Sequence, residues 1–321
     1  MAPYNSGTMR ALTSRVCAVL LAATLIMPVV WAGEPVTLRY RWQPGETLEY
    51  LIAANLEGAT REGGARVVIL RARTEMPITL RTLSVGVTGV ATIQVACERI
   101  TVSVEMLGQM VNLSVDARGV KGDLNGAPLS RKVMADLEPE LTELQKLVRQ
   151  SFVVRLDARG TMADSPLGCA DQVRQLLPLI DLPELPVREG DSFVSRARFD
   201  GPYAGVGGTA GALSRYVQDV TYLLKAIEGE VDNCWAVVES QQNSTLGRMR
   251  LEGGSEVDVT LSMRSSGRFD IGNGRLQSEQ LTATFTARPL RSRESPFEVV
   301  VRREIALCGG KNGGGSASRN N

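Results

Sequence analysis

The stretches WQPGETL (42–48) and VREGDSF (187–193) share one layout and together suggest the fold. Each runs in the order apolar residue, two intervening residues, glycine, acid, hydroxyl residue, apolar residue. Pro44 presets its own φ, and Gly45 and Gly190 tolerate the positive φ that a type II turn requires. Each stretch therefore predicts a glycine-centred turn that starts a β-strand.

A second phrase recurs as VDARG (115–119) and LDARG (156–160), and more loosely as FDIGNG (269–274). Asp at the first and Gly at the fourth position suit a type I turn whose glycine is left-handed, and the Asn-Gly at 273–274 suits a type I′ hairpin. The functional alternative is an active-site pair of Asp and Arg. Turn chemistry already accounts for the Asp and the Gly, so we interpret these phrases as turns.

The two landmarks recur in the same order and at similar spacing. The turn glycine and the turn aspartate are 71 residues apart in the first copy (Gly45 to Asp116) and 80 in the second (Gly190 to Asp270). This order predicts that a hairpin-bearing module was duplicated in tandem.

Apolar runs of period two fill the two predicted halves, 33–157 and 158–308, and period two is typical of strands. In one of them, Ile93, Val95 and Cys97 share a face. The runs are VTLRYRW (36–42), GVATIQVACERITVSVEM (89–106), TYLLKAIEGEVDNCWAVVES (221–240), EVDVTLSMRSSGRFDI (256–271), RLQSEQLTATFTA (275–287) and FEVVVRREIAL (297–307). The predicted fold is mainly β (α+β), with long, curved antiparallel strands and a short helical insertion between the halves.

Two helices are predicted. An apolar stripe indicates an amphipathic helix over about 129–149, and Pro139 kinks it or starts a second helix after Leu137. The stripe consists of Leu129, Val133, Leu137, Leu141, Leu144 and Val148. A helix over about 166–177 begins with Pro166 at its first position. Both helices are expected to pack against a sheet, with partner or membrane binding as the alternative. DLPELP (181–186) is interpreted as a linker, and 309–321 as a disordered tail.

The N-terminus predicts export. Two arginines and then the apolar run VCAVLLAATLIMPVVW (16–31) have the order of a secretory signal peptide over 1–32, cleaved after Ala32. Translation starts at Met1 or Met9. The alternative is an uncleaved membrane anchor, although the run is shorter than the roughly 20 apolar residues of a spanning helix. The mature protein is expected to be periplasmic or extracellular.

The remaining cysteines are Cys97, Cys169, Cys234 and Cys308. In an oxidising compartment, four cysteines can form two disulfides in three connectivities, which the sequence does not rank. Buried small hydrophobic residues are the alternative. The spacing offers no CxxC pair and the chain has no histidine, so no metal site is predicted.

The order of several phrases resembles a family of exported bacterial proteins of unknown function, of planctomycete type. The phrases are YRWQPGETLEY (40–50), LPELPVREGDSF (182–193), VTYLLKAI (220–227) and SGRFDIGNGRL (266–276). That family has a paired pGe…Y and lP…v…Gd.W layout and a late hairpin, and Phe193 stands where the family usually has Trp. The resemblance implies an exported β-rich domain and supplies no catalytic residues.

Composition excludes several common chemistries. With 36 Lys+Arg, 35 Asp+Glu and a net charge of +1, no basic patch for nucleic acid is evident. The lack of histidine excludes a Ser-His-Asp triad and His-ligated zinc. The glycine-rich run GVGGTAG (205–211) lacks nucleotide-binding spacing. The acids Glu138, Glu140 and Glu143 at a helix start suit the helix dipole. No catalytic, cofactor-binding or metal residue is predicted.

Two functional hypotheses follow. The first is a non-catalytic exported β protein that binds a partner or acts as a scaffold at the cell envelope. One form of it is a carrier that holds a lipid or lipoprotein chain in an apolar cavity. The alternative is a hydrolase that uses only Asp and Glu, which requires two carboxylates roughly 5 to 10 Å apart in one open cleft.

Overall fold

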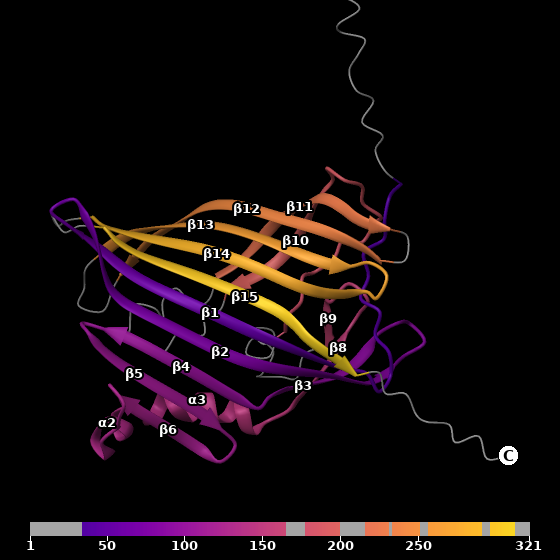
Figure 1. Cartoon of the computed structure of the whole chain (residues 1–321). Helices are drawn as coiled ribbons and strands as arrows, with labels where there is room; N and C mark the ends of the chain where they lie inside the picture. The colour runs from indigo at the N-terminus through magenta and orange to yellow at the C-terminus, as the bar shows by residue number, and fades with distance from the viewer. Residues whose placement is uncertain are drawn as a thin grey trace, which may run out of the picture. The chain divides into compact units, whose positions relative to one another are not determined.

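Fifteen strands of the described residues form one antiparallel sheet (Figure 1). The computed structural model describes residues 34–164, 177–199, 216–230, 233–250, 256–290 and 296–311. The strands are β1 (Thr47–Glu62), β2 (Ala65–Val85), β3 (Ala91–Cys97), β4 (Arg99–Met106), β5 (Gln109–Asp116), β6 (Gly119–Leu124), β7 (Ala127–Pro128), β8 (Phe152–Leu156), β9 (Met162–Asp164), β10 (Ser192–Phe199), β11 (Tyr216–Glu230), β12 (Asn233–Arg250), β13 (Glu256–Asp270), β14 (Arg275–Pro289) and β15 (Phe297–Lys311). The mainly β prediction is confirmed.

The strand order is β10-β11-β12-β13-β14-β15-β1-β2-β4-β5-β6-β7. β15 therefore pairs with β1, so both predicted halves contribute to a single sheet. The sheet forks beyond β2, which pairs with β4 along Leu70–Glu75 and with β3 along Ile78–Val85. Glu98 is the break between β3 and β4, after which β3 pairs with β8 and β4 pairs with β5.

The two quoted stretches form turns with the same backbone hydrogen bonds. Gly45 N donates to Thr82 O (2.8 Å) and Thr82 N donates to Glu46 O (2.9 Å). In the second turn, Gly190 N donates to Leu224 O (2.8 Å) and Leu224 N donates to the backbone oxygen of Asp191 (2.9 Å). Gly45 has φ 78° and Gly190 has φ 87°, and each turn leads into a strand that pairs with the next one. The predicted turns are confirmed, and the tandem duplication stays a prediction that this likeness supports.

The aspartate phrases are turns as well. Asp116 Oδ1 accepts the N–H groups of Arg118 (2.8 Å) and Gly119 (3.1 Å). Asp157 Oδ1 accepts those of Arg159 (2.8 Å) and Thr161 (2.9 Å). Turn chemistry thus accounts for both aspartates.

The third aspartate phrase corrects a prediction. Asp270 pairs with Arg275, so the loop between β13 and β14 has four residues and is not a two-residue type I′ hairpin at 273–274. Asp270 accepts both the backbone N–H (2.8 Å) and the side-chain amide (2.7 Å) of Asn273, and this bonding favours the longer loop.

The strand predicted over VTLRYRW (36–42) is wrong apart from one bridge, Val36 to Val187. Leu38 and Tyr40 are nevertheless buried. Tyr40 N donates to Ala158 O (2.7 Å), and its hydroxyl group lies 3.0 Å from Ile180 N, which donates to it. The backbone hydrogen bonds of this segment go mostly to loops. The alternation of apolar and polar residues therefore reflects alternate burial of side chains and not pairing with a neighbouring strand.

The predicted amphipathic helix is two helices, α2 (Arg131–Asp136) and α3 (Glu138–Arg149). Leu137 ends α2 and precedes α3, and Pro139 lies in the first turn of α3, where its missing N–H is not needed. Leu141 and Val148 are buried as predicted, whereas Val133 is 37% exposed, contrary to the stripe.

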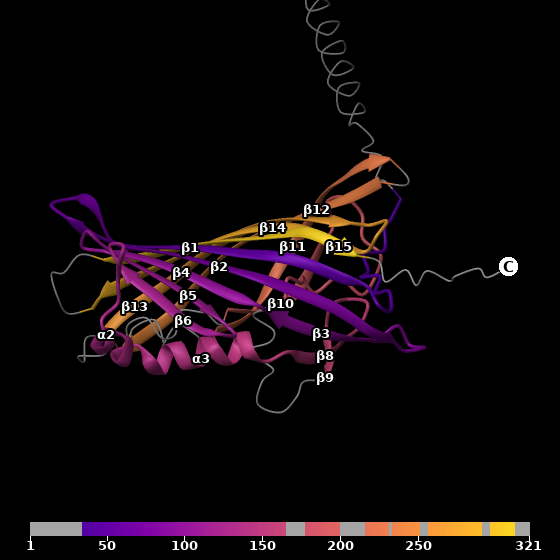
Figure 2. The same cartoon turned by 60° about the horizontal axis from the view of Figure 1, so that its bottom comes forward.

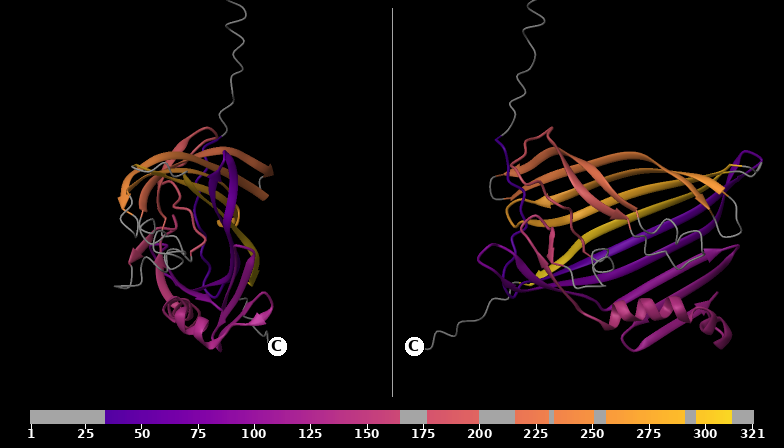
Figure 3. Two further views of the ribbon diagram at one scale, coloured as in Figure 1. Left: turned by 90° about the vertical axis from the view of Figure 1, so that its left-hand side faces the viewer. Right: turned by 180° about the vertical axis from the view of Figure 1, so that it is seen from behind.

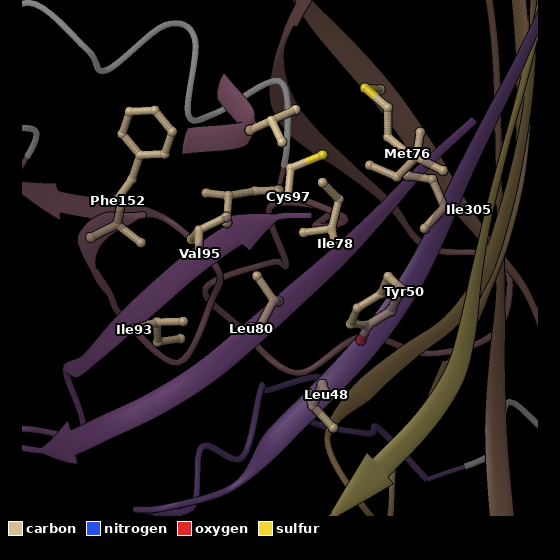
Figure 4. Packing of buried hydrophobic residues seen from close by; sticks show 14 of the residues in the cluster. Leu48, Tyr50, Met76, Ile78, Leu80, Ile93, Val95, Cys97, Phe152 and Ile305 are labelled. Atoms are coloured by element: carbon tan, nitrogen blue, oxygen red, sulfur yellow. The ribbon is translucent and has the colours of Figure 1, made fainter. Parts of the chain in front are cut away.

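The buried side chains form two clusters. One lies on β1, β2, β3 and β8 under α3 and includes Leu48, Ile78, Ile93 and Phe152 (Figure 4). The predicted face of Ile93, Val95 and Cys97 belongs to it. The other cluster joins the 36–42 segment to β10–β14, through residues such as Leu224.

Some predictions lie beyond the described residues. These are the signal peptide (1–32), most of the helix at 166–177, Cys169 and the run at 205–211. The predicted linker 181–186 contains no helix or strand. The disordered tail was predicted to begin at 309, but β15 continues to Lys311 because Gly309 and Gly310 pair with β1.

Candidate functional site

The two faces of the sheet differ in chemistry. We call the face that carries Leu48, Tyr50 and Ile52 the inner face, and α3 packs on this side of the curved sheet (Figures 2 and 3). The outer face of the same strands carries Glu57, Arg71 and other charged residues, because alternate residues of a strand point to opposite faces.

An apolar band crosses the inner face from β14 to β6. Register pairs its members across neighbouring strands, and each is half-buried. The band consists of Phe285, Val299, Val301, Leu56, Leu70, Ala72, Val104, Val111 and Leu124. Apart from Phe285, which packs against the second cluster, none of them belongs to either core cluster of the described residues. The band is thus an apolar surface additional to the cores.

An ion pair lies next to this band. Arg303 follows Val301 on the inner face of β15, and its Nη2 donates to Glu279 Oε2 on β14 at 2.9 Å. The Glu279 side chain is 3% exposed and that of Arg303 is 34% exposed. Arg303 Nε is buried and has no hydrogen-bond partner within the described residues. The side chain is nevertheless partly exposed, so the five N–H donors of the guanidinium leave capacity for an anion at its exposed part.

Further polar side chains surround Glu279. Ser240 and Ser265 hydrogen bond to each other across β12 and β13 at 2.8 Å, and both are buried. Burial, and then the nearby Glu279 carboxylate, raises the pKa of the Tyr222 hydroxyl well above its usual range. Tyr222 is therefore a neutral donor at ordinary pH, and it belongs to a buried polar cluster beside Glu279.

A second ion pair joins the turn before β1 to the first residue of β14. Glu46, which is 1% exposed, pairs with Arg275. Tyr50 lies close by, and its hydroxyl group donates to Leu276 O at 3.0 Å. Residues of the first turn thus hold the start of a strand more than two hundred positions later in the chain.

The outer face has an open depression of about 390 Å³. Arg71 bridges two carboxylates in it, with Nε 3.6 Å from Glu57 Oε2 and Nη1 3.3 Å from Glu105 Oε2. The hydrogen bond from Arg66 lowers the pKa of Glu57, so this carboxyl group is ionised and unsuited to act as a general acid. The depression is thus an ion-pair network in which Arg71 lies between two acids.

The described cysteines are Cys97, Cys234 and Cys308, and all three are free thiols. Burial raises the pKa of the Cys97 thiol to about 11, so it behaves as a buried hydrophobic residue. Within the described ranges, no group of three His, Cys, Asp or Glu residues could hold a metal. No described helix is long and apolar enough to span a membrane.

Sequence reasoning did not find Arg303, Glu279 or the band. The period of two predicted an apolar face on each strand, but it did not say which faces adjoin across β14, β15 and β1. The signal that was available was a charged pair interrupting apolar alternation, Glu279 in RLQSEQL and Arg303 in VVVRREI.

The fold and this face define a large antiparallel β-sheet protein. No protein-family model matches the chain, and no curated protein matches it. A solved structure described as lipid–protein interactions in lipovitellin is similar at a TM-score of 0.42 and 13% identity, over 87% of this chain and 27% of that chain. DynF from the dynemicin pathway of Micromonospora chersina is similar at 0.23 and 9%, over 87% of this chain and 88% of that one.

The chain thus spans about a quarter of the lipovitellin chain. These likenesses are distant, and no conclusion about activity follows from them. The resemblance to the exported bacterial family has no matching family model and stays a prediction.

Proposed function

We propose that the chain binds an apolar ligand, such as the acyl chain of a lipid, on the inner face of its sheet. The observation that carries this proposal is the half-buried apolar band from β14 to β6. Burying apolar surface contributes about 25 cal/mol per Å², and a contiguous band offers that surface where the cores do not. The opposite face of the same strands carries Arg71 and Glu57 and does not offer it.

The ion pair at Arg303 supports a ligand with an anionic head. Arg303 lies two residues after Val301 on the same face of β15. A carboxylate or phosphate bound at the exposed part of its guanidinium would therefore place the acyl chain along the band. Charge-assisted hydrogen bonds of this kind contribute about 1.5 to 3 kcal/mol. We therefore expect palmitate to bind about tenfold or more tightly than its methyl ester, measured by calorimetry. Equal affinities would remove Arg303 from the proposal.

The proposal is tested by native mass spectrometry of protein purified from cells. Wild type is expected to carry lipid, and Leu56→Glu is expected to carry about tenfold less, because a carboxylate in the band has to be desolvated against the chain. A clean ligand-free mass for wild type, after expression in cells and after incubation with palmitate, would overturn the proposal.

Asn55→Glu is the matched control. Asn55 is the exposed neighbour of Leu56 on the same strand and points to the outer face, near Arg73. The Asn55→Glu substitution introduces the same charge one residue away on the opposite face, so the lipid content is expected to stay at the wild-type value. Equal loss in both variants would show that the band does not hold the lipid.

We also propose that the role is non-catalytic and that the protein is exported to the cell envelope. The support for export is the charged and then apolar order of residues 1–32. The support for a non-catalytic role is the ion pairing of the acids in the outer depression, with Arg71 between Glu57 and Glu105.

A further inference from the structure

The hairpin between β4 and β5 has an unusual tip. Leu107 has φ 51° and Gly108 has φ 77°, so both turn residues are left-handed. This conformation suits Asn or Gly, and a branched apolar residue there is strained. The Leu107 side chain is 83% exposed, and Met106 and Met110 beside it are 55% and 45% exposed. The hairpin thus bears strain while presenting three apolar side chains to solvent.

The neighbouring hairpin shows the ordinary solution. Asn125 has φ 50° and Gly126 has φ 83°, which is the Asn-Gly pair that such a turn favours. Asn125 Oδ1 accepts Met110 N at 2.8 Å, so the two tips lie side by side. A polar residue can therefore adopt the backbone geometry that Leu107 has. Strain at an exposed apolar residue points to a role in binding.

The surroundings indicate what the tip binds. Helix α2 lies at the same end of the sheet (Figures 1 and 2), and it carries the exposed cations Arg131 and Lys132 against one acid, Asp136. Exposed Val133 follows them. Apolar side chains beside cations suit the surface of an anionic bilayer.

The tip is also continuous with the apolar band. Met106 pairs with Leu70 on the inner face, next to the pair of Ala72 and Val104. An acyl chain leaving a bilayer at the tip would therefore reach the band without crossing a charged surface.

We propose that the hairpin tip of Met106, Leu107 and Met110 inserts into the surface of an anionic lipid bilayer, with α2 providing the basic contacts. This inference rests on the proposed function, because the tip would supply the band with lipid. A partner protein is the competing occupant and is an outcome of the test.

The test measures binding of the full chain to vesicles of equimolar phosphatidylcholine and phosphatidylglycerol by flotation. Leu107→Asn is expected to weaken binding by about tenfold or more, because it removes a leucine side chain that insertion would bury in the bilayer. The same change relieves strain, so the thermal midpoint is expected to stay equal or rise. Lost binding with retained stability cannot be attributed to unfolding.

Val87→Asn is the matched control. Val87 is fully exposed in the β2–β3 connection at the opposite end of the sheet. Binding is expected to be unchanged in this variant. Tryptophan fluorescence gives a direct readout. Brominated lipid should quench the tryptophan introduced by Leu107→Trp and should not quench the one introduced by Val87→Trp, and both variants share the same background from the native tryptophans. Arg131→Gln with Lys132→Gln should weaken binding to the anionic vesicles and reduce its dependence on salt.

The outcomes separate the two proposals. If wild type carries lipid from cells but does not float with vesicles, the proposed insertion of the tip is overturned and lipid binding by the band stands. A partner protein would then be the expected occupant of the tip. If flotation depends on Leu107 but the purified protein carries no lipid, the insertion of the tip is supported and the proposed lipid binding on the inner face is overturned. Equal flotation of wild type and Leu107→Asn would also overturn the proposed insertion of the tip into the bilayer.

Discussion

Glu46→Gln is expected to lower the free energy of unfolding by about 3 to 5 kcal/mol. Glu46 is 1% exposed, and its partner Arg275 has a side chain that is 15% exposed. Removing the carboxylate leaves a largely buried guanidinium without its counter-charge, and this unpaired charge is the physical cost. Urea unfolding followed by circular dichroism measures the change.

The chain supplies its own control for this prediction. Asp191 occupies the same place in the second turn, but it is exposed and accepts the N–H of Arg188 through Oδ2 at 2.7 Å. Asp191→Asn is expected to change stability by no more than about 0.5 kcal/mol. Adding Arg275→Met to Glu46→Gln should recover part of the loss. Equal midpoints for Glu46→Gln and wild type would show that the pair is not structural.

Gly274→Ala is expected to destabilise the protein by about 3 kcal/mol, combining a left-handed backbone with a steric clash. Gly274 has φ 64°, and a β-carbon there would lie 2.5 Å from Arg41 N and 2.6 Å from Arg39 O. Backbone atoms cannot move aside as a side chain can, so the 36–42 segment would be displaced from the sheet. This displacement would also break the hydrogen bond from Arg41 N to Gly274 O (3.1 Å). Urea unfolding measures the loss in the free energy of unfolding.

Gly190→Ala separates the two contributions. Gly190 has φ 87°, but a β-carbon there meets nothing within 4 Å. Only the backbone cost remains, which is about 1 to 2 kcal/mol. If the two variants lose the same stability, the close approach of the 36–42 segment contributes nothing.

Local patterns predicted much of the fold. The period of two placed the strands at 256–270 and 275–289 almost to the residue, since each alternates between a buried and a solvated face. Pro139 predicted where the second helix begins. These features depend on neighbours a few positions apart, so one sequence contains enough information for them.

The failures share a different cause. Residues 36–42 alternate like a strand, yet they have no partner strand and bond to loops instead. No local pattern predicts the strain at Leu107, because it arises from a turn conformation that leucine does not favour. The candidate site was missed because its parts adjoin only when β15 pairs with β1.

By itself, the sequence determined the turns at Gly45 and Gly190, the aspartate turns and the alternation of the strands. Steric limits on φ and the pleat of a strand act within a few residues, so they can be read without the rest of the chain. Only the tertiary structure decided that Glu46 is buried against Arg275 while Asp191 is exposed, and that one inner face joins an apolar band to Arg303. These features follow from strand pairing between distant segments, whose register no local pattern specifies.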